Sequence, residues 1–378
     1  MLNLFIILLS ILLQIAAAGL ALRMNRIVAR PVAWMLISGA LALMAGFGLA
    51  TRPVDLANAE AVKAAVADAD FVVGAVPGFM GFATAKAVLE AAKPLVDISF
   101  FDEDCFELDA LAKAQQVTAI VDCGIAPGCH NIILGHLSTQ WDRISSFECL
   151  VGGLPVIRTW PYEYKAGFSP IDVIEEYTRP TRYVKDGKVV VFPALSEAEL
   201  LDFPGLGTLE SFNTDGLRSL IKSFPGIPDM KEKTLRYPGH IEKMRMFRES
   251  GFFNKEKIRV GDVEVSPLDL TTSLLFPLWF MAEGDEDFTV MRVTVEGEKD
   301  GQPMRQELNL LDRYDQATRT TSMARTTGYT CTAAVRLLAS GGFTRKGISP
   351  PEVVGQQPGA WAFIRAEMAK RNVIFTEG

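Results

Sequence analysis

Three short apolar runs decide the fold: DFVVGAV (70–76), PLVDI (94–98) and VTAIVD (117–122). Segments of about ten residues with apolar positions at helical spacing separate the runs, so the pattern predicts a β-α-β-α-β order. Strands that are apolar throughout and joined by helices form parallel sheets that are covered on both faces. The sequence therefore predicts an α/β protein with a parallel sheet in this segment.

Ligands of such sheets bind beyond the carboxyl ends of the strands. The chain lacks, before Asp55, the glycine-rich turn that usually holds a pyrophosphate and the acid that usually binds the ribose. The sheet is therefore predicted to be an incomplete Rossmann-like one that binds the charged centre of a dinucleotide weakly. We expect the residues that follow the three runs to contact the cofactor: Ala75, Val76, Pro77, Ser99 and Gly124.

The first 50 residues are of a different kind. They contain two uncharged apolar runs, 2–22 and 31–50, separated by a segment with three Arg and no acidic residue. Each run is close to the roughly 20 residues that a helix needs to cross a bilayer, so we predict a transmembrane hairpin at 1–50 and attachment to a membrane. Two alternatives stay open: buried core helices, and a fused or mis-started reading frame, which would leave the protein cytoplasmic.

The composition excludes some partners. The chain has 38 Lys and Arg against 45 Asp and Glu, and three of the basic residues lie before residue 51. The remaining acidic body disfavours nucleic acid as a partner. Five Cys without a CxxC pair, and three scattered His, indicate neither a disulfide framework nor a metal site. We predict no metal and expect the body to lie in the cytoplasm, where thiols stay reduced.

The alternation of helices and strands stops after residue 128. Segments such as RYVKDGKVVVF (182–192) and the long run 287–311 contain central Asp-Gly turns, which are typical of antiparallel hairpins. We therefore predict a partial dinucleotide-binding domain at 51–128 and an α+β, mostly antiparallel substrate domain at 129–318. Helices at 319–378 are expected to return to the first domain.

Six motifs stand in this order along the chain: DCGIAPG (122–128), VGGLP (151–155), YKAGFSP (164–170), TDGLRSL (214–220), TLRYPGH (234–240) and MARTTGYT (323–330). Together they resemble the saccharopine dehydrogenase family, most closely its lysine 6-dehydrogenase branch. The resemblance covers about residues 55–378 and implies an NAD- or NADP-dependent oxidoreductase that transfers hydride between an amine carbon and the nicotinamide. It also implies a small amino-acid substrate and a homodimer.

Oxidation of an amine needs a group that takes the ammonium proton. We predict catalytic roles for Asp122, which would hold the substrate ammonium, for His240 as an acid or base, and for Lys165 near the cofactor or substrate. Each has a structural alternative: a strand-end Asp often caps a turn, a His often binds backbone, and a loop Lys is often merely exposed.

Three further residues are predicted to bind the substrate. Arg236 offers a planar fork for a carboxylate, Thr214 offers a hydroxyl, and Cys123 lies next to Asp122. The alternatives are an ordinary ion pair for Arg236 and a packing role for the Cys123 thiol. A second function also stays open, that of a membrane-tethered or truncated protein that binds an amino acid but no cofactor.

Overall fold

The structure, a computed structural model, describes residues 52–378, and its contacts divide the chain into two compact units. Unit 1 comprises the residues up to Val121 together with Thr344–Ile348, and unit 2 comprises Asp122–Phe343 and Ser349–Gly378. The predicted transmembrane hairpin lies outside the described residues. Within residues 52–378, no helix combines the length and the apolar character that a membrane crossing requires.

Unit 1 contains the predicted β-α-β-α-β segment. Its sheet has the strand order β1-β2-β3-β14, and β2 is parallel to both β1 and β3. The prediction of a parallel sheet is therefore confirmed. In chain order the elements are α3 (Ala59–Val66), β1 (Val72–Gly74), α4 (Gly78–Glu90), β2 (Leu95–Asp97), the 3-10 turn Cys105–Leu108, α5 (Asp109–Ala114), β3 (Thr118–Ile120) and β14 (Gly347–Ser349).

Local sequence accounts for the ends and the core of these elements. The Asn58 side chain caps α3 by accepting hydrogen bonds from the backbone N–H groups of Glu60 and Ala61, at 3.0 and 3.3 Å. Leu89 of α4 and Leu95 of β2 are almost fully buried in one apolar cluster. The apolar runs form a parallel sheet because helices supply the cover that such strands need.

Unit 2 is built on a nine-stranded mixed sheet. The main path runs β15-β13-β12-β4-β9-β5-β6, with β7 and β8 attached to β9 through β8. Only the β4–β9 pair is parallel among the strand pairs described for this sheet. The expectation of a mostly antiparallel sheet is confirmed. The strands are β4 (Arg143–Pro155), β5 (Thr181–Lys185), β6 (Lys188–Phe192), β7 (Glu199–Phe203), β8 (Gly207–Asn213), β9 (Asp229–Arg236), β12 (Asp287–Lys299), β13 (Gln302–Arg313) and β15 (Phe375–Glu377).

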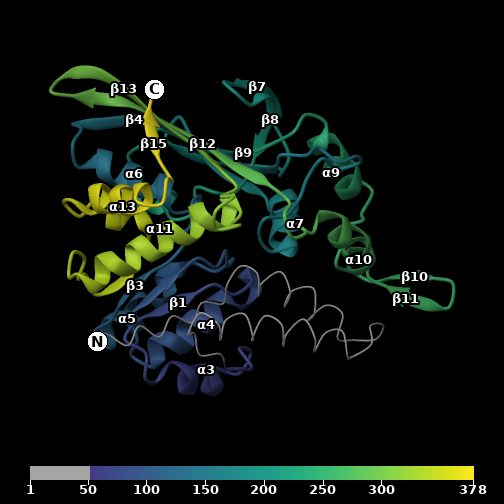
Figure 1. Ribbon diagram of the computed structural model, residues 1–378, viewed down its shortest axis with the longest axis horizontal. Coiled ribbons are helices and arrows are strands. Elements are labelled where there is room, and N and C mark those ends of the chain that lie inside the picture. The colour runs from purple at the N-terminus through teal and green to yellow at the C-terminus, as the bar shows by residue number, and fades with distance from the viewer. Residues whose placement is uncertain (1–51) are drawn as a thin grey trace. The chain divides into compact units, whose positions relative to one another are not determined.

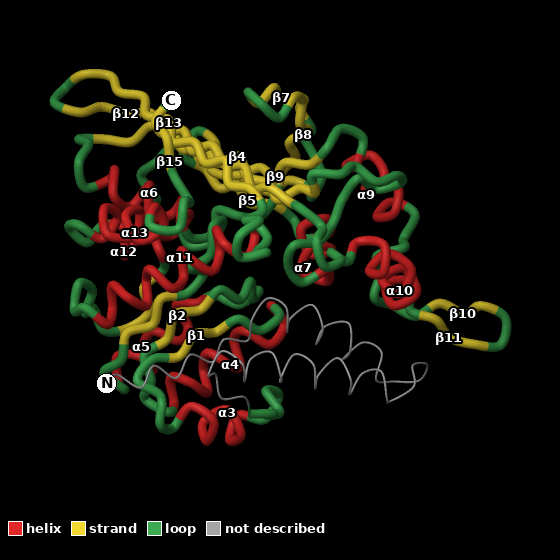
Figure 2. Tube along the Cα trace, viewed as in Figure 1, coloured by secondary structure: helices red, strands yellow, loops and turns green. Residues whose placement is uncertain are grey.

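Helices cover this sheet, and one short hairpin stands apart from it. Figure 1 shows α6, α11 and α13 on one face of the sheet, and Figure 2 shows the strands as one twisted band. The hairpin of β10 (Ile258–Val260) and β11 (Val263–Val265) forms a sheet of its own. The helices are α6 (Cys129–Ser138), α7 (Pro170–Thr178), α8 (Leu220–Ser223), α9 (His240–Glu249), α10 (Pro267–Trp279), α11 (Ser322–Ala339), α12 (Pro351–Gly355) and α13 (Ala360–Ala369).

The end of the chain contributes to both units. Helices α11, α12 and α13, which lie in the segment 319–378 that we expected to return to the first domain, are grouped with unit 2. The part that joins unit 1 is the segment Thr344–Ile348, in which β14 begins. Strand β14 pairs with the edge of β3 that β2 does not occupy. Beside this pair, the Gly347 backbone N–H donates to the carbonyl of Val117 at 2.9 Å.

Two glycines allow α6 and α12 to cross closely. A Cβ atom on Gly135 of α6 would lie 2.0 Å from the carbonyl oxygen of Glu352 in α12. A Cβ atom on Gly355 of α12 would lie 2.1 Å from the carbonyl oxygen of Ile132. Each helix therefore presents a glycine to the backbone of the other, and no larger residue fits without moving a helix.

We predict that Gly135→Ala lowers the free energy of unfolding by about 2–3 kcal/mol, because overpacking against backbone cannot be relieved by a side-chain rotation. Equilibrium denaturation in urea measures the effect. The control is Gly328→Ala in α11, where a Cβ atom meets nothing within 4 Å. Alanine there should be neutral or stabilise by up to about 1 kcal/mol. Equal stability of the two variants would contradict the close crossing.

Candidate functional site

The candidate site in unit 2 begins with an ion pair between Asp122 and Arg218. Both side chains are buried, and the Arg218 guanidinium donates Nε–H to Oδ2 at 3.1 Å and Nη2–H to Oδ1 at 3.2 Å. Both residues also have positive φ, 53° for Asp122 and 51° for Arg218. Backbone strain of this kind persists where surrounding contacts hold it, and it is common at functional sites.

A tight turn follows Asp122 and leads into α6. The Gly124 N–H binds the carbonyl of Pro127 at 3.0 Å, and the Cys129 N–H binds the carbonyl of Gly124 at 3.1 Å. Gly128 has φ 136°, and a Cβ atom there would lie 1.9 Å from the Gly124 oxygen. Gly128 of the DCGIAPG motif is therefore required by close backbone approach. Cys123 is fully buried, which favours the packing role that the sequence left open.

A buried acid–imidazole pair lies deeper in unit 2. Glu232 of β9 and His130 of α6 approach to 3.3 Å between Oε2 and Nε2, and both side chains are buried. Burial, together with the nearby carboxyl groups of Glu176 and Asp215, raises the pKa of Glu232 to about 8, although Arg218 opposes the shift. Burial lowers the pKa of His130 to about 3. At neutral pH the pair is therefore uncharged and the proton resides on Glu232.

The turn that carries Arg218 packs directly on this pair. A Cβ atom on Gly216 would lie 1.9 Å from the carboxyl carbon of Glu232. Asp215 forms a bidentate ion pair with Arg182, whose Nε–H donates to Oδ1 at 2.9 Å and whose Nη2–H donates to Oδ2 at 2.7 Å. The Thr214 hydroxyl is hydrogen-bonded to that of Thr234 in β9 at 3.0 Å. The TDGLR sequence is thus a buried turn in which the predicted substrate residue Thr214 has a partner within the protein.

Arg236 and His240 belong to an aromatic cluster. Arg236 is buried, donates Nη2–H to Glu176 at 2.7 Å and Nε–H to the Tyr177 hydroxyl at 3.2 Å, and lies over the Tyr164 ring at 4.6 Å. Burial raises the pKa of Glu176, and Arg236 opposes that shift. The guanidinium already has a carboxylate partner, so the geometry favours the ion-pair alternative for Arg236 over direct binding of a substrate carboxylate.

His240 is also fully engaged. Its Nδ1 lies 2.9 Å from the carbonyl of Tyr162, and its Nε2 lies 2.9 Å from the Tyr177 hydroxyl. A carbonyl only accepts, so Nδ1 carries the proton and Nε2 accepts from Tyr177. Burial, and the charge of Arg236, lower the pKa of His240 to about 3. The imidazole stays neutral at physiological pH, which favours its structural alternative over acid–base catalysis.

The remaining predicted catalytic residue, Lys165, lies at the surface of unit 2. Its ammonium donates to the carbonyl of Phe280 at 2.9 Å and lies 3.6 Å from Asp285. These contacts fix the loop of the YKAGFSP motif against the segment after α10. Lys165 therefore has a structural role in addition to the catalytic role that remains a prediction.

In unit 1 the predicted cofactor residues gather at one edge of the sheet. Ala75 and Val76 directly follow β1, and Ser99 follows β2, whose Asp97 is the register partner of Gly74. The buried Asp97 carboxylate accepts from the backbone N–H of Ser99 at 2.8 Å and from its hydroxyl at 3.1 Å. A Cβ atom on Gly74 would lie 1.8 Å from Asp97 Oδ2.

The N-terminus of α4 opens at the same edge. Pro77 is the residue before this 13-residue helix and provides no side-chain cap, and the Met80 N–H donates to the Pro77 carbonyl at 2.9 Å. Ligands of parallel sheets bind beyond the carboxyl ends of the strands, and the small residues that follow β1 leave space there. This edge of unit 1 is compatible with a nicotinamide cofactor, and contacts from Ala75, Val76, Pro77 and Ser99 remain a prediction.

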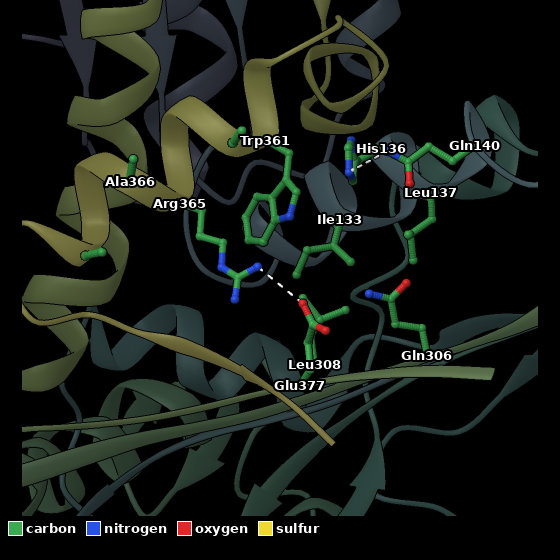
Figure 3. Close-up of a pocket in the computed structure, with 12 residues that line it drawn as sticks. Ile133, His136, Leu137, Gln140, Gln306, Leu308, Trp361, Arg365, Ala366 and Glu377 are labelled. Atoms are coloured by element: carbon green, nitrogen blue, oxygen red, sulfur yellow. Dashed lines mark hydrogen bonds and ion pairs between the residues drawn. The ribbon is translucent and has the colours of Figure 1, made fainter.

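Unit 2 also contains a cavity of about 450 Å³ that includes none of the predicted site residues. Figure 3 shows Trp361 and Ile133 at its wall, with polar side chains around them. These polar groups bind one another: Arg365 pairs with Glu377 at 3.5 Å, and Gln140 contacts His136 at 3.0 Å. Among residues 52–378, no cluster of three or more His, Cys, Asp or Glu could hold a metal ion.

Comparison with known proteins places the two units in one family. The family model described as "Saccharopine dehydrogenase C-terminal domain" matches residues 124–374, and that described as "Saccharopine dehydrogenase NADP binding domain" matches residues 32–120. The chain belongs to the saccharopine dehydrogenase family. The family resemblance of the six motifs is confirmed. The cofactor-domain match includes residues 32–50, so the comparisons support neither membrane tethering nor the loss of cofactor binding.

Part of the chain is similar in sequence to curated proteins, which include an alpha-aminoadipic semialdehyde synthase and a saccharopine dehydrogenase. The chain is 26% identical over 224 residues to the mitochondrial alpha-aminoadipic semialdehyde synthase of Bos taurus, covering 55% of this chain and 24% of that protein. It is 23% identical over 241 residues to the saccharopine dehydrogenase [NADP(+), L-glutamate-forming] of Saccharomyces cerevisiae, covering 60% of this chain and 53% of that protein. The chain thus matches a quarter to a half of the length of these relatives.

Solved structures show the same fold. Apo saccharopine dehydrogenase (L-Glu forming) from Saccharomyces cerevisiae has a TM-score of 0.71 at 18% identity, covering 98% of this chain and 97% of that chain. The homospermidine synthase of Legionella pneumophila, solved with NAD, has a TM-score of 0.63 at 11% identity, covering 89% and 82%. At these identities the likeness establishes the architecture of this saccharopine dehydrogenase family member and not its substrate.

The buried Glu232 yields a prediction on pH. Its pKa is about 8 in the folded protein against 4.5 for an ordinary glutamate, so between these values the folded state holds a proton that the unfolded state lacks. Stability therefore falls as pH rises through this window. In Glu232→Gln this pH-dependent contribution is absent. We therefore expect the free energy of unfolding of the variant, relative to that of the wild type, to rise by on the order of 1 kcal/mol per pH unit between about pH 5 and 8.

Urea denaturation of both proteins at several pH values measures this difference. The control is Glu256→Gln, at an exposed glutamate, which should follow the wild-type pH dependence. Parallel stability curves for the wild type and Glu232→Gln would show that Glu232 does not hold its proton in the folded state.

Proposed function

We propose that this chain is a nicotinamide-dependent oxidoreductase that acts on a C–N bond of an amino acid, with saccharopine as the first candidate substrate and lysine as the second. The observation that carries the proposal is the position of Asp122 and its partner Arg218. Asp122 lies in the short segment between the two matched family domains, residues 32–120 and 124–374. Asp122 therefore follows the matched cofactor domain directly in the sequence, and both Asp122 and its partner Arg218 belong to unit 2.

The chemistry requires a carboxylate that can hold an ammonium group. A carboxylate has about four acceptor sites, and Arg218 uses one on each oxygen of Asp122. The remaining sites can accept N–H bonds from a substrate, while Arg218 fixes the orientation of the carboxylate. When bound, the nicotinamide ring would donate or accept the hydride. Asp122 would then hold the substrate nitrogen and take part in its deprotonation, and Arg218 is a positioning residue.

The other polar residues of unit 2 support this role indirectly. Hydrogen bonds link Arg236 to Tyr177 and Tyr177 to His240, and these bonds hold the aromatic cluster rigid. The pair of Glu232 and His130 is neutral and underlies the turn that presents Arg218. Rigid support is what a substrate-orienting carboxylate needs. We further propose that NADP is the cofactor, because the matching family domain is described as NADP binding.

The test is the formation of reduced nicotinamide by the purified full chain with saccharopine or lysine, with either NADP or NAD. Asp122→Asn should reduce kcat/KM at least about tenfold, since it removes a charged contact to the reacting nitrogen. Arg218→Lys should lower kcat with a smaller change in KM, because it misorients the carboxylate. Asp202→Asn, at an exposed aspartate of β7, serves as the control with unchanged kinetics.

Two results would contradict the proposal. One is the absence of turnover with both amino acids and both cofactors. The other is a wild-type kcat/KM in Asp122→Asn, which would move the chemistry to another group even if the family activity were present.

A further inference from the structure

Glu352 has a buried carboxyl group that joins three segments of unit 2. It is the second residue of α12 and is 0% exposed. Its Oε2 accepts hydrogen bonds from the Asn131 amide and from the Ser219 hydroxyl, each at 3.1 Å. Its Oε1 accepts from the Ser223 hydroxyl at 2.5 Å. Asn131 and Ser219 lie 221 and 133 positions from Glu352 along the chain, so one side chain connects segments that are distant in sequence.

The bond to Ser219 reaches the segment that carries Arg218. Ser219 directly follows Arg218 and is 7% exposed. A hydrogen bond that fixes the Ser219 side chain also restrains the backbone next to it, where Arg218 has a φ of 51°. A positive φ is uncommon for a residue other than glycine and persists where contacts hold it. The Glu352–Ser219 bond is one such contact.

The bond to Asn131 reaches the turn that follows Asp122. Asn131 is fully buried, and its Oδ1 accepts the backbone N–H of Gly128 at 3.0 Å. Gly128 lies directly on Gly124, because a Cβ atom on Gly128 would be 1.9 Å from the Gly124 carbonyl oxygen. Gly124 is two residues from Asp122, which has a φ of 53°. Short series of hydrogen bonds and backbone contacts therefore lead from Glu352 to both partners of the ion pair.

The position of Glu352 is itself fixed. Figure 2 shows α12 beside α6, and the Glu352 carbonyl oxygen would lie 2.0 Å from a Cβ atom on Gly135 of α6. Burial raises the pKa of Glu352, and the hydrogen bonds from Ser223, Ser219 and Asn131 oppose that shift. Burying an acid costs free energy that an apolar residue would avoid. The carboxyl group is therefore explained by the groups that it connects and not by packing.

We propose that Glu352 is a positioning residue that sets the orientation of Asp122 and Arg218 toward each other for the reaction. The inference rests on the proposed function, in which Asp122 holds the substrate nitrogen. Glu352 acts through Ser219 and Asn131. A displacement of about 1 Å at a reacting group can cost on the order of a hundredfold in rate, whereas the charge that attracts the ammonium stays in place. The expected signature is a lower kcat with a nearly unchanged KM.

Two serine variants separate positioning from simple stabilisation. Each removes one hydroxyl that donates to Glu352, and the bond from Ser223 is the shorter one. Ser219 adjoins Arg218, whereas Ser223 is the last residue of α8. We expect Ser219→Ala to lower kcat at least about tenfold with KM changed less than about threefold, and Ser223→Ala to lower kcat less than about threefold. A structural role alone would make Ser223→Ala at least as harmful, and that result would overturn the proposal.

Variants of Glu352 itself test what the carboxyl group supplies. In Glu352→Gln the amide oxygen can accept from Asn131 and Ser219, and the Ser223 hydroxyl can accept from the amide N–H. Glu352→Leu keeps the bulk and loses all three bonds. We expect kcat to stay within about threefold of the wild type in Glu352→Gln and to fall at least about a hundredfold in Glu352→Leu. Equal kcat values in the two variants would contradict the proposal.

The coupling between Asp122 and Arg218 tests the same inference without turnover. The free energy of unfolding is measured for Asp122→Asn, Arg218→Gln and the double variant, in the wild-type, Ser219→Ala and Ser223→Ala backgrounds. We expect the coupling energy to fall by at least about half with Ser219→Ala and to stay unchanged with Ser223→Ala.

The two measurements also separate this inference from the proposed function. Absence of turnover together with the expected loss of coupling would refute the proposed function and leave the orienting role of Glu352 in place. An unchanged coupling energy in Ser219→Ala would overturn the role of Glu352 even in an active enzyme.

Discussion

Arg218 is the charge on which the interior of unit 2 depends. Its guanidinium binds both oxygens of Asp122 and also lowers the pKa of Glu232, which burial and two further carboxyl groups raise. Removing one partner of a buried ion pair leaves an uncompensated charge and costs about 3–5 kcal/mol. The turn that carries Arg218 must therefore stay in place, and it does so by packing Gly216 on the neutral Glu232–His130 pair.

This arrangement links the fold to the proposed chemistry. The β4–β9 pair is parallel within an otherwise antiparallel sheet, and β9 carries Glu232 and Arg236 into the interior. A carboxylate that orients a substrate needs support that does not itself change charge during the reaction. Neutral His240 and the neutral pair of His130 and Glu232 provide such support at physiological pH.

The sequence predicted the parallel sheet and the hairpins because their signals are local. Apolar runs and Asp-Gly turns act over a few residues. It also indicated Asp122, since a polar residue at the end of an apolar strand is visible in the pattern. Its partner Arg218 lies within the TDGLRSL motif, but the sequence does not predict the pair, because the two residues are 96 positions apart and no local pattern connects them. Glu232 stands among lysines in KEKTLR and resembles a surface residue, yet it is buried.

The roles of Arg236 and His240 could not be derived from residue type. A lone Arg or His is compatible with binding or with structure, and only the positions of Glu176, Tyr177 and the Tyr162 carbonyl show that their groups are engaged. The position of the C-terminal helices likewise depends on packing partners that are distant in sequence. The motifs thus identified the candidate residues, whereas the pairing of their charges required the structure.

The most direct test of this account is a double-mutant cycle on the Asp122–Arg218 pair. The free energy of unfolding is measured for the wild type, Asp122→Asn, Arg218→Gln and the double variant. We predict that each single change costs about 3 kcal/mol and that the double change costs little more, with a coupling energy of about 2 kcal/mol or greater. Additive losses, with a coupling energy within about 0.5 kcal/mol of zero, would show that the pair does not organise the interior of unit 2.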